Sequence, residues 1–276
     1  MNIFITGASG FIGRHLIAVL LKSGHNITAC TYKTELPFAV KILKFDFANM
    51  RQVSNWLPYL KDIEVVINCV GIIAETKKHS FEVMHYLAAV ALFKACEQSQ
   101  IKRVVQISAL GADNLAIVNY HKTKKRADDY LRQSSLAWFV LRPSLVFGSN
   151  GKSFNFFRRL SKLPIVPLIG SGEQMIQPVH IDTVIQSIEQ CLRVKQTNQT
   201  IDVVGERAIS YKDWMLQLRQ KPNALFIKIP IKLMKLLAWL TQPFKLALIS
   251  RDNLIMLEQN NVADHAPLKI FLENSK

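Results

Sequence analysis

Cysteine is scarce in this chain, and long uncharged apolar runs are missing from it. The four cysteines among 276 residues lie far apart in apolar surroundings, at Cys30, Cys69, Cys96 and Cys191. This spacing argues against a disulfide framework or a cysteine metal site, so we expect buried, reduced thiols and a reducing compartment. No stretch approaches the roughly 20 uncharged apolar residues of a membrane-spanning helix. A strand beginning at residue 2 leaves no room for a signal peptide, so we expect a cytoplasmic protein.

Acidic residues are also few. The chain has 20 of them and 35 lysines and arginines, which gives a net charge of +15. The excess is spread along the chain, with 17 basic and 10 acidic residues in 1–138 and 18 and 10 in 139–276. A nucleic-acid-binding arm would concentrate the charge, so we expect no nucleic acid partner. The spread charge fits attraction to anionic lipid or to an acidic partner, and it equally fits a basic solvated surface.

Strand-like apolar runs alternate with helical patterns along the chain, without internal repeats or low-complexity tracts. This order predicts βαβ units around a parallel sheet, an α/β fold of the Rossmann-type doubly wound class with helices on both faces. The expected strands lie at 2–5, 26–32, 42–45, 64–69, 103–107, 138–141 and 200–204. One expected helix begins after residue 10, and the others lie at 49–60, 80–98, 118–134, 181–194, 210–219, 230–241 and 251–259.

The junction between the first strand and the first helix reads Thr-Gly-Ala-Ser-Gly-Phe-Ile-Gly over residues 6–13. Gly7 permits a tight turn, Gly10 lets a backbone approach a pyrophosphate, and Gly13 lets the helix pack closely on the strand. The helix N-terminus offers unpaired N–H groups and a partial positive charge to the phosphates. The expected dinucleotide-binding residues are Gly7, Ser9, Gly10, Phe11, Ile12, Gly13 and Arg14.

Glycines and prolines interrupt the periodicity beyond Pro143, which favours excursions that build a second lobe. We therefore divide the chain into a dinucleotide-binding domain, 1–147, and a smaller C-terminal substrate lobe, 148–276. Residues 181–205 are expected to return to the main sheet. We place the functional cleft between the lobe and the C-terminal ends of the strands, because ligands bind there in open α/β sheets.

Three polar side chains are predicted to meet in this cleft. Tyr120 and Lys124 are four residues apart on one expected helix and therefore share a face. An ammonium beside a phenol favours the phenolate, so we expect Lys124 to lower the pKa of Tyr120 and make it an acid or base near neutrality. Ser108 ends the fifth strand, where its hydroxyl can hydrogen-bond a carbonyl oxygen. The order of glycine turn, strand-end Ser, Tyr-x-x-x-Lys and Arg142-Pro143 makes the pattern specific.

That order resembles the short-chain dehydrogenase/reductase superfamily along the whole chain, and the extended and atypical members look most similar. The phrases Ile-Ser-Ala-Leu-Gly-Ala at 107–112, Leu-Arg-Pro-Ser-Leu-Val-Phe-Gly at 141–148, Gln-Pro-Val-His-Ile-Asp at 177–182 and Asp-Asn-Leu at 252–254 carry the resemblance. They are similar to the subfamily related to the NAD(P)-binding accessory subunit of respiratory complex I. The resemblance implies a Rossmann-type domain with NAD(P) across the strand ends.

The resemblance also implies roles for residues at several strand ends. Ser108, Tyr120 and Lys124 match the catalytic Ser, Tyr and Lys, and Lys124 also holds the nicotinamide ribose. Further cofactor contacts are implied at Asp46 and Phe47 beside the adenine, Val70 and Gly71 beside its ribose, and Pro143 to Val146 beside the nicotinamide. Two positions depart from the pattern, because Thr123 replaces a common Ser and His85 lies where many relatives have a proton-relay Asn.

The residues after the second strand bear on which cofactor binds. NAD-binding sites place an Asp or Glu there to hold the ribose 2′-hydroxyl, whereas this chain has Thr31, Tyr32 and Lys33. Arg14 adds a second cation after the third glycine. Two cations without a carboxylate favour NADP, whose 2′-phosphate needs positive charge. If Lys33 and Arg14 are only solvated surface residues, NAD stays open.

Two further segments allow more than one interpretation. His180 and Asp182 make a poor metal pair on a strand-to-helix entry, so we expect no metal site. Instead Asp182 is expected to cap the helix and His180 to contact substrate. Residues 214–251 hold seven cations and no carboxylate. They fit peripheral contact with the inner face of an anionic membrane, and they also fit a substrate-lobe helix packed on the core.

The leading hypothesis is an NADP(H)-dependent oxidoreductase that acts on a small molecule, an unidentified carbonyl or alcohol. Tyr120 would exchange the proton of the substrate oxygen, Lys124 would orient Tyr120 and the ribose, and Ser108 would hold the oxygen. The alternative is a non-catalytic NAD(P)-binding structural or assembly subunit, associated with a membrane respiratory complex, that keeps the cofactor as a ligand.

Overall fold

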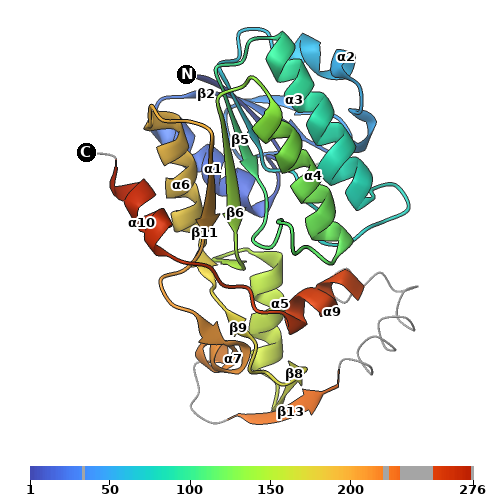
Figure 1. The fold of residues 1–276 in the computed structure, drawn as a ribbon, viewed down its shortest axis with the longest axis vertical. Helices are drawn as coiled ribbons and strands as arrows, with labels where there is room; N and C mark the ends of the chain where they lie inside the picture. Colours follow the sequence, from blue (N-terminus) through green and yellow to red (C-terminus); the bar gives the residue numbers. More distant parts are fainter. Residues whose placement is uncertain (33–34, 220–223, 231–250, 275–276) are drawn as a thin grey trace.

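A computed structural model of the chain describes residues 1–32, 35–219, 224–230 and 251–274. Its main part is a seven-stranded parallel sheet with helices on both faces (Figure 1), which confirms the predicted Rossmann-type architecture. The strands, in order across the sheet, are β11 (Gln199–Val203), β6 (Trp138–Pro143), β5 (Arg103–Ile107), β4 (Val65–Asn68), β1 (Asn2–Thr6), β2 (Asn26–Thr31) and β3 (Lys41–Lys44). The strand order reverses between β1 and β4, and such a reversal opens a crevice at the carboxyl ends of the strands.

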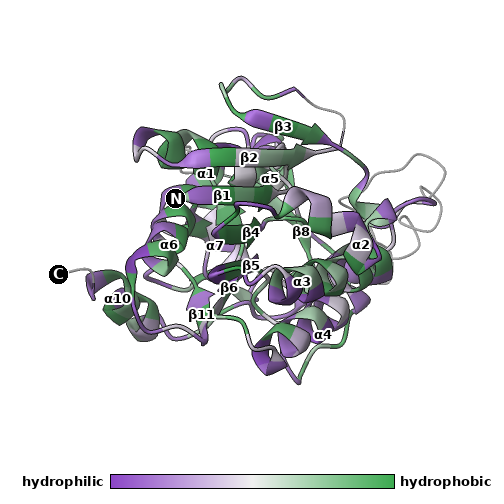
Figure 2. Cartoon of the chain, turned by 90° about the horizontal axis from the view of Figure 1, so that it is seen from above, coloured by the Kyte–Doolittle hydropathy of each residue, from purple (hydrophilic) through white to green (hydrophobic). Residues whose placement is uncertain are grey.

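Helices cover the two faces of this sheet, as Figure 2 shows from above. One face carries α1 (Phe11–Lys22), α6 (Ile181–Arg193) and α10 (Ala266–Glu273), and the other carries α3 (Ala88–Gln98) and α4 (Asn119–Gln133). Because successive residues of a strand point to opposite faces, strands covered on both sides must be apolar throughout. This is why short continuous apolar runs in the sequence identified the strands.

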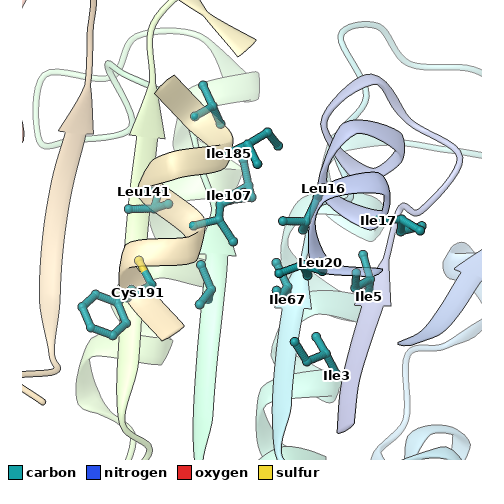
Figure 3. Packing of buried hydrophobic residues seen from close by; sticks show 14 of the residues in the cluster. Ile3, Ile5, Leu16, Ile17, Leu20, Ile67, Ile107, Leu141, Ile185 and Cys191 are labelled. Atoms are coloured by element: carbon teal, nitrogen blue, oxygen red, sulfur yellow. The ribbon is translucent and has the colours of Figure 1, made fainter. Parts of the chain in front are cut away.

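The packing of β1 illustrates the two faces. Ile5 points to α1, where it packs with Leu16 and Leu20 (Figure 3). Phe4 points to the other face and packs edge-on against Trp56, with ring centroids 6.3 Å apart. All five side chains are fully buried, so each face of the sheet has its own apolar core.

A smaller region lies beyond the carboxyl ends of the strands, at the bottom of Figure 1. Its elements are β7 (Val146–Phe147), α5 (Lys152–Ser161), β8 (Ile165–Ile169), β9 (Met175–Ile176), β10 (Val179–His180), β12 (Ile209–Ser210), α7 (Tyr211–Arg219), β13 (Leu225–Ile229) and α9 (Arg251–Glu258). The strands pair two by two, β7 with β10, β9 with β12, and β8 with β13. A third apolar core holds this region together around Phe157, Tyr211 and Trp214.

The chain returns to the large sheet twice after it enters the smaller region. β11 pairs in parallel with β6, as expected for residues 181–205. α10 then packs on α6 and β11, where Gln190 Nε2 donates a hydrogen bond to the carbonyl oxygen of Phe271 at 2.8 Å. The division of the chain at residues 147 and 148 stays a prediction, since the two regions share these connections.

The helix predicted over 49–60 is present only in part and is not continuous. The chain forms three short pieces there, η1 (Phe47–Asn49), α2 (Val53–Trp56) and η2 (Leu57–Tyr59). The indole Nε1 of Trp56 donates to the carbonyl oxygen of Met50 at 2.9 Å, and Pro58 cannot supply a helical N–H. Burial of Trp56 therefore decides the path of the backbone more strongly than local helix propensity does.

Other elements differ from the sequence-based expectation in kind or in number. The helix predicted at 80–98 begins with a π-helical segment, η3 (Glu82–Leu87), before α3. The predictions missed α5 and α10, and they missed the short strands β7, β8, β9, β10, β12 and β13. Of the helix predicted at 230–241, residues 231–241 lie outside the described residues. The remaining expected strands and helices are found within two residues of their predicted limits.

Three features expected from composition can be compared with the described residues. The four cysteines are unpaired, and Cys30, Cys96 and Cys191 are buried as expected, whereas Cys69 is partly exposed. Within the part of the chain that the structure describes, no helix is both long and apolar enough to cross a membrane. No cluster of three or more His, Cys, Asp or Glu side chains suited to a metal ion occurs among those residues.

Candidate functional site

The turn between β1 and α1 is shaped by its glycines. Gly7 has a φ of 67°, and a Cβ atom there would lie 2.8 Å from the carbonyl carbon of Cys69. A Cβ atom at Gly13 would lie 2.5 Å from the carbonyl oxygen of Gly7, so only glycine lets the helix approach the turn. No side chain caps the first turn of α1 after Gly10, and no acidic residue lies in it. Its N–H groups and the positive end of its dipole fit a diphosphate.

The side chains around this turn point to three different places. Ile12 lines the central cleft, whereas the ring of Phe11 lies 3.3 Å from the position of a Cβ atom at Gly148 and so packs on the loop after β7. Arg14 is exposed, and its Nε donates to the carbonyl oxygen of Ser9 at 3.0 Å. This hydrogen bond holds a positive charge beside the glycine turn.

The end predicted to hold the adenosine contains a contact between Asp46 and His79 that the sequence did not indicate. The carboxylate of Asp46 lies 3.0 Å from His79 Nε2 and accepts a hydrogen bond from the amide two residues later at 3.0 Å. The ring of Tyr32 packs edge-on against His79, with centroids 5.4 Å apart. Phe47 turns its side chain into the core, which leaves its backbone for contact with an adenine. Lys33 lies outside the described residues.

Buried polar side chains join three strand ends next to the turn. Thr6 Oγ1 donates to Asn68 Oδ1 at 2.5 Å, and Asn68 Nδ2 donates to Gln106 Oε1 at 2.7 Å. Asn68 Oδ1 also accepts from the amide of Val70 at 3.2 Å. This row fixes the ends of β1, β4 and β5 and sets the direction of the loop through Val70 and Gly71, which is the predicted ribose loop.

Lys124 lies where that loop, β5 and α4 meet. Its Nζ donates to the carbonyl oxygen of Ile107 at 3.1 Å and lies 3.5 Å from the position of a Cβ atom at Gly71. The same Nζ is 5.9 Å from the centroid of the Tyr120 ring. Burial lowers the pKa of Lys124 to about 8. The structure therefore brings Lys124 and Tyr120 together with the loop after β4.

The expected lowering of the pKa of Tyr120 is not found. Burial raises the pKa of this phenol to about 12, because the ring is enclosed by Phe81, His85 and His121 while Lys124 lies over its face. The neighbouring ammonium favours the phenolate, but the loss of solvent around the ring outweighs that effect. In this geometry Tyr120 holds its proton at neutral pH.

Ser108 and Asp128 form a buried pair that the sequence analysis missed. The Ser108 hydroxyl donates a hydrogen bond to one carboxylate oxygen of Asp128, and the other oxygen has no partner among the described residues. Burial raises the pKa of this carboxyl to about 7, against the opposing effects of Ser108 and Lys124. Asp128 follows Lys124 by four residues on α4, as Lys124 follows Tyr120. That interval was the signal for Asp128, since it places all three on one helix face.

His85, which lies where relatives have a proton-relay Asn, links the loop after β4 to α4. Its Nε2 accepts a hydrogen bond from the amide of Ile72 at 3.1 Å, and its Nδ1 lies 3.2 Å from Thr123 Oγ1. Burial and the charge of Lys124 hold the pKa of His85 well below its usual value. The ring is therefore neutral, with Nδ1 as the donor to Thr123.

A cleft of about 720 Å³ lies beside these side chains, between the strand ends and the smaller region, as expected. Ser108, Tyr120, Pro143 and Val146 line it together with Ile12. The position predicted for the nicotinamide, at Pro143 and Val146, is thus continuous with the side chains predicted to act on a substrate. A nicotinamide at the predicted position and a substrate at Ser108 and Tyr120 would therefore share one cleft.

His180 takes a different position from the one predicted. It is the N-cap residue of α6, and its Nδ1 accepts from the amide of Asp182 at 3.3 Å, so the cap is His180 and not Asp182. Its ring packs against Phe147, with centroids 5.1 Å apart. Among the described residues His180 does not line the cleft, and its contact with a substrate stays a prediction without support from this geometry.

Comparisons with known proteins agree with this arrangement. A family model described as NAD(P)H-binding matches residues 7–157. The chain is 28% identical over 201 residues to NADH dehydrogenase (ubiquinone) 1 alpha subcomplex subunit 9, mitochondrial, from Arabidopsis thaliana, covering 68% of this chain and 49% of that protein. It is 24% identical over 184 residues to ceramide reductase from Caulobacter vibrioides, covering 64% and 56%. The matched parts thus span about half the length of these relatives.

Solved structures share the fold over most of the chain. The UDP-glucuronic acid 4-epimerase of Bacillus cereus, in complex with UDP-glucuronic acid and NAD, superposes with a TM-score of 0.76 at 19% identity, covering 99% of this chain and 93% of that one. The dTDP-glucose 4,6-dehydratase of Bacillus anthracis, in complex with NAD, gives a TM-score of 0.71 at 17% identity, covering 83% and 84%.

Proposed function

Because the chain belongs to the NAD(P)H-binding family, within the short-chain dehydrogenase/reductase superfamily, we propose that it is an oxidoreductase that interconverts a carbonyl and an alcohol. The observation that carries this proposal is the position of Lys124. Its Nζ lies 3.5 Å from the Cβ position of Gly71 on the predicted ribose loop and 5.9 Å from the ring centroid of Tyr120. One ammonium can therefore serve a cofactor ribose and an acid at the cleft.

Three residues at the cleft have separate roles in the proposed reduction. A bound nicotinamide supplies the hydride that the carbonyl carbon accepts. Tyr120 then donates its hydroxyl proton to the carbonyl oxygen, and the Lys124 ammonium stabilises the phenolate until solvent returns a proton. Ser108 donates a hydrogen bond to the same oxygen after its hydroxyl turns away from Asp128. A phenol that keeps its proton at neutral pH suits this direction of the reaction.

Replacement of the phenol tests the proposal. Tyr120→Phe should lower turnover with a reducible carbonyl at least 1000-fold, on the order of the general acid contribution, while the dissociation constant for NADPH stays within about threefold. Tyr130→Phe is the matched control on α4, because the Tyr130 hydroxyl bonds Glu97 at 3.0 Å and does not line the cleft. Full activity in Tyr120→Phe would contradict the assignment of this acid.

We propose NADP as the preferred cofactor, with NAD as the weaker ligand. The exposed Arg14 places a cation at the glycine turn, and Tyr32 stands after β2 where NAD-binding sites have an acidic residue. Calorimetric titration with NADPH and NADH should give the lower dissociation constant for NADPH. Arg14→Ala should remove most of that difference, whereas the exposed Arg207→Ala should not. Tighter binding of NADH to the unchanged protein would reject the preference.

A second candidate is a nucleotide-binding subunit of a larger assembly that does not turn over. The relative named as a subunit of NADH dehydrogenase favours it, as does the Ser108 hydroxyl that is held by Asp128. This candidate predicts no oxidation of NADPH with any carbonyl in a broad panel. It also predicts slow exchange of bound cofactor and co-purification with a larger complex, whereas the enzyme predicts turnover by the isolated chain.

The location of the protein and its contact with a membrane are also proposals. We propose a cytoplasmic protein that touches an anionic membrane through part of the segment 214–251. In the described part of this segment, α7 buries Trp214 and Met215 in the third core, which supports the lobe-helix alternative there. β13, in contrast, exposes Leu225 and Ile227 beside the cation Lys228. The membrane proposal therefore rests on β13, and most of the remainder of the segment lies outside the described residues.

A further inference from the structure

Most of the residues that line the cleft are apolar, although Ser144, Asn253 and Asn261 add polar groups beside those already described. The large domain contributes Ile12, Ile73, Ile107, Ala109, Leu110, Leu115 and Pro143. The smaller region contributes Leu145, Val146, Phe156, Phe157, Ile176, Met256, Leu257 and Val262. A ligand in this cleft loses water from most of its surface to hydrocarbon, which favours an aliphatic group over a sugar or a phosphate.

Charge points the same way. Among the described residues that line the cleft, Asp113 is the one acidic residue, and none is a lysine or an arginine. His121 also lines the cleft, and burial lowers its pKa to about 4, so it is neutral. Gln259 and Asn260, at the α9 side, are uncharged amides. A nucleotide diphosphate is bound by arginines, lysines or a helix N-terminus, and the described lining supplies no such cation.

The apolar lining continues to the surface of the protein. Leu115 is 86 % exposed, Val262 is 40 % exposed and Ile73 is 37 % exposed, and all three line the cleft. The amide of Leu115 is held by the carboxylate of Asp113 at 2.9 Å, so the exposed side chain is presented by a bonded turn. A long chain whose end leaves the cleft would cover these three side chains and remove their contact with water.

From these observations we infer that the cleft takes a carbonyl or alcohol carried on a long aliphatic chain, and not a sugar nucleotide. The inference rests on the proposed function, because the reacting carbon must lie between Ser108 and Tyr120. The chain then lies along Phe157 and Met256 and emerges past Leu115. The cleft volume of about 720 Å³ includes the position predicted for the nicotinamide, beside Pro143 and Val146, and the chain takes the remaining space.

A homologous series of methyl ketones tests the inference. The oxidation of NADPH is followed with 2-butanone, 2-hexanone, 2-octanone, 2-decanone and 2-dodecanone, below their aggregation limits. The value of kcat/KM should rise about fourfold for each methylene group, the factor that corresponds to roughly 0.8 kcal/mol per buried CH2. UDP-glucose at millimolar concentration should neither react nor inhibit. A flat series, or competition by UDP-glucose, overturns the inference.

Exposed positions provide variants that leave the core untouched. Leu115→Ser removes apolar surface at the mouth of the cleft, so the dodecanone to butanone ratio of kcat/KM should fall at least fivefold. Leu225→Ser is the matched control, since Leu225 is 65 % exposed on β13 and does not line the cleft. Its ratio should equal that of the unchanged protein. Equal ratios in both variants would contradict the path past Leu115.

Binding measured without turnover separates this inference from the proposed function. Calorimetry with 1-dodecanol in the presence of NADPH, a pair that cannot react because both partners are already reduced, should give a dissociation constant at least tenfold below that of 1-hexanol. If dodecanol binds but no ketone is reduced, the inference stands and the proposed function fails. If short polar carbonyls are reduced and dodecanol does not bind, the function stands and the inference is overturned.

Discussion

Asp128 is a residue whose state controls its neighbours in the candidate site. It accepts the Ser108 hydrogen bond, and it faces the positive charges of Lys124, Arg132 and Arg142 from α4 and β6. A buried carboxyl that holds a proton can keep Ser108 in place, whereas a carboxylate attracts Lys124 more strongly. We therefore assign Asp128 a positioning role for Ser108 and Lys124.

The pH dependence of stability should report this carboxyl. Its pKa is 3.8 as a free side chain and about 7 in the folded protein, so the folded state binds the proton more tightly. The stabilisation is complete below the lower value and is lost as the pH rises to about 7. The free energy of unfolding of the unchanged protein, relative to Asp128→Asn, should thus fall between pH 4 and 7, by at most about 1.4 kcal/mol per pH unit.

Urea unfolding at pH 4, 5, 6, 7 and 8 measures this difference. Asp129→Asn, one residue along α4, is the control, because Asp129 is partly exposed and pairs with Lys125 and Arg132 outside the Ser108 contact. Its difference from the unchanged protein should lack the fall. A flat difference in Asp128→Asn would mean that the folded state does not protonate this carboxyl near neutrality.

The turn between β1 and α1 carries a prediction for binding. A Cβ atom at Gly13 would meet the backbone of Gly7 at 2.5 Å and of Ala8 at 2.8 Å, so helix and turn must separate. Gly13→Ala should weaken NADPH binding at least tenfold and lower the free energy of unfolding by about 1–3 kcal/mol. Gly24→Ala, where the Cβ atom meets nothing within 4 Å, should cost roughly 1 kcal/mol from its positive φ alone and leave binding unchanged.

The helix α10 provides a test of how the chain end stabilises the large sheet. Phe271 is 4 % exposed, and its ring lies 6.1 Å from that of Phe139 in β6. Phe271→Ala should lower the free energy of unfolding by about 3–5 kcal/mol. The neighbouring Ile270 is 58 % exposed, so Ile270→Ala should change it by about 0.5 kcal/mol or less. Equal losses in the two variants would show that α10 does not dock through Phe271.

The elements that the sequence predicted are those whose signal is local. β1 and β4 are continuous apolar runs, and α4 repeats its buried face every four residues, so their types follow from spacing alone. The break near Trp56 and the π-helical start of η3 depend on partners distant in the chain, such as Thr123 for His85. Among the described residues, β8 and β13 pair only with each other, and more than fifty residues separate them in the chain. The prolines near β8 do not suggest a strand, so the sequence did not predict it.

At the scale of the whole molecule, the parts of the site come from four strand ends that meet at one edge of the sheet. Glycine spacing predicted the turn after β1, and family phrases predicted the ends of β5 and β6. The contact of Asp46 with His79 joins residues 33 positions apart in the chain, and the hydrogen bond of Ser108 to Asp128 joins residues 20 positions apart. Contacts of this kind depend on how α4 and the loop after β4 pack, so a local sequence pattern does not predict them.

The net charge of +15 predicts that the protein binds to anionic membranes. β8 and β13 form an exposed apolar face with Ile165, Leu225 and Ile227, and Lys228 is exposed beside them. Such a face can enter the boundary of an anionic bilayer while cations meet the headgroups. The protein should therefore sediment with vesicles containing 30% phosphatidylglycerol at about 50 mM salt, and the bound fraction should fall steeply at about 500 mM.

Two substitutions locate that contact. The double variant Leu225→Ser with Ile227→Ser should lower the partition coefficient roughly tenfold at low salt, because partly buried leucine and isoleucine side chains are lost from the bilayer boundary. Ile270→Ser removes an equally exposed side chain from α10 and should bind like the unchanged protein. Absence of lipid-dependent sedimentation at low salt would remove the membrane proposal. Undiminished binding of the double variant would assign the contact to a different surface from β8 and β13.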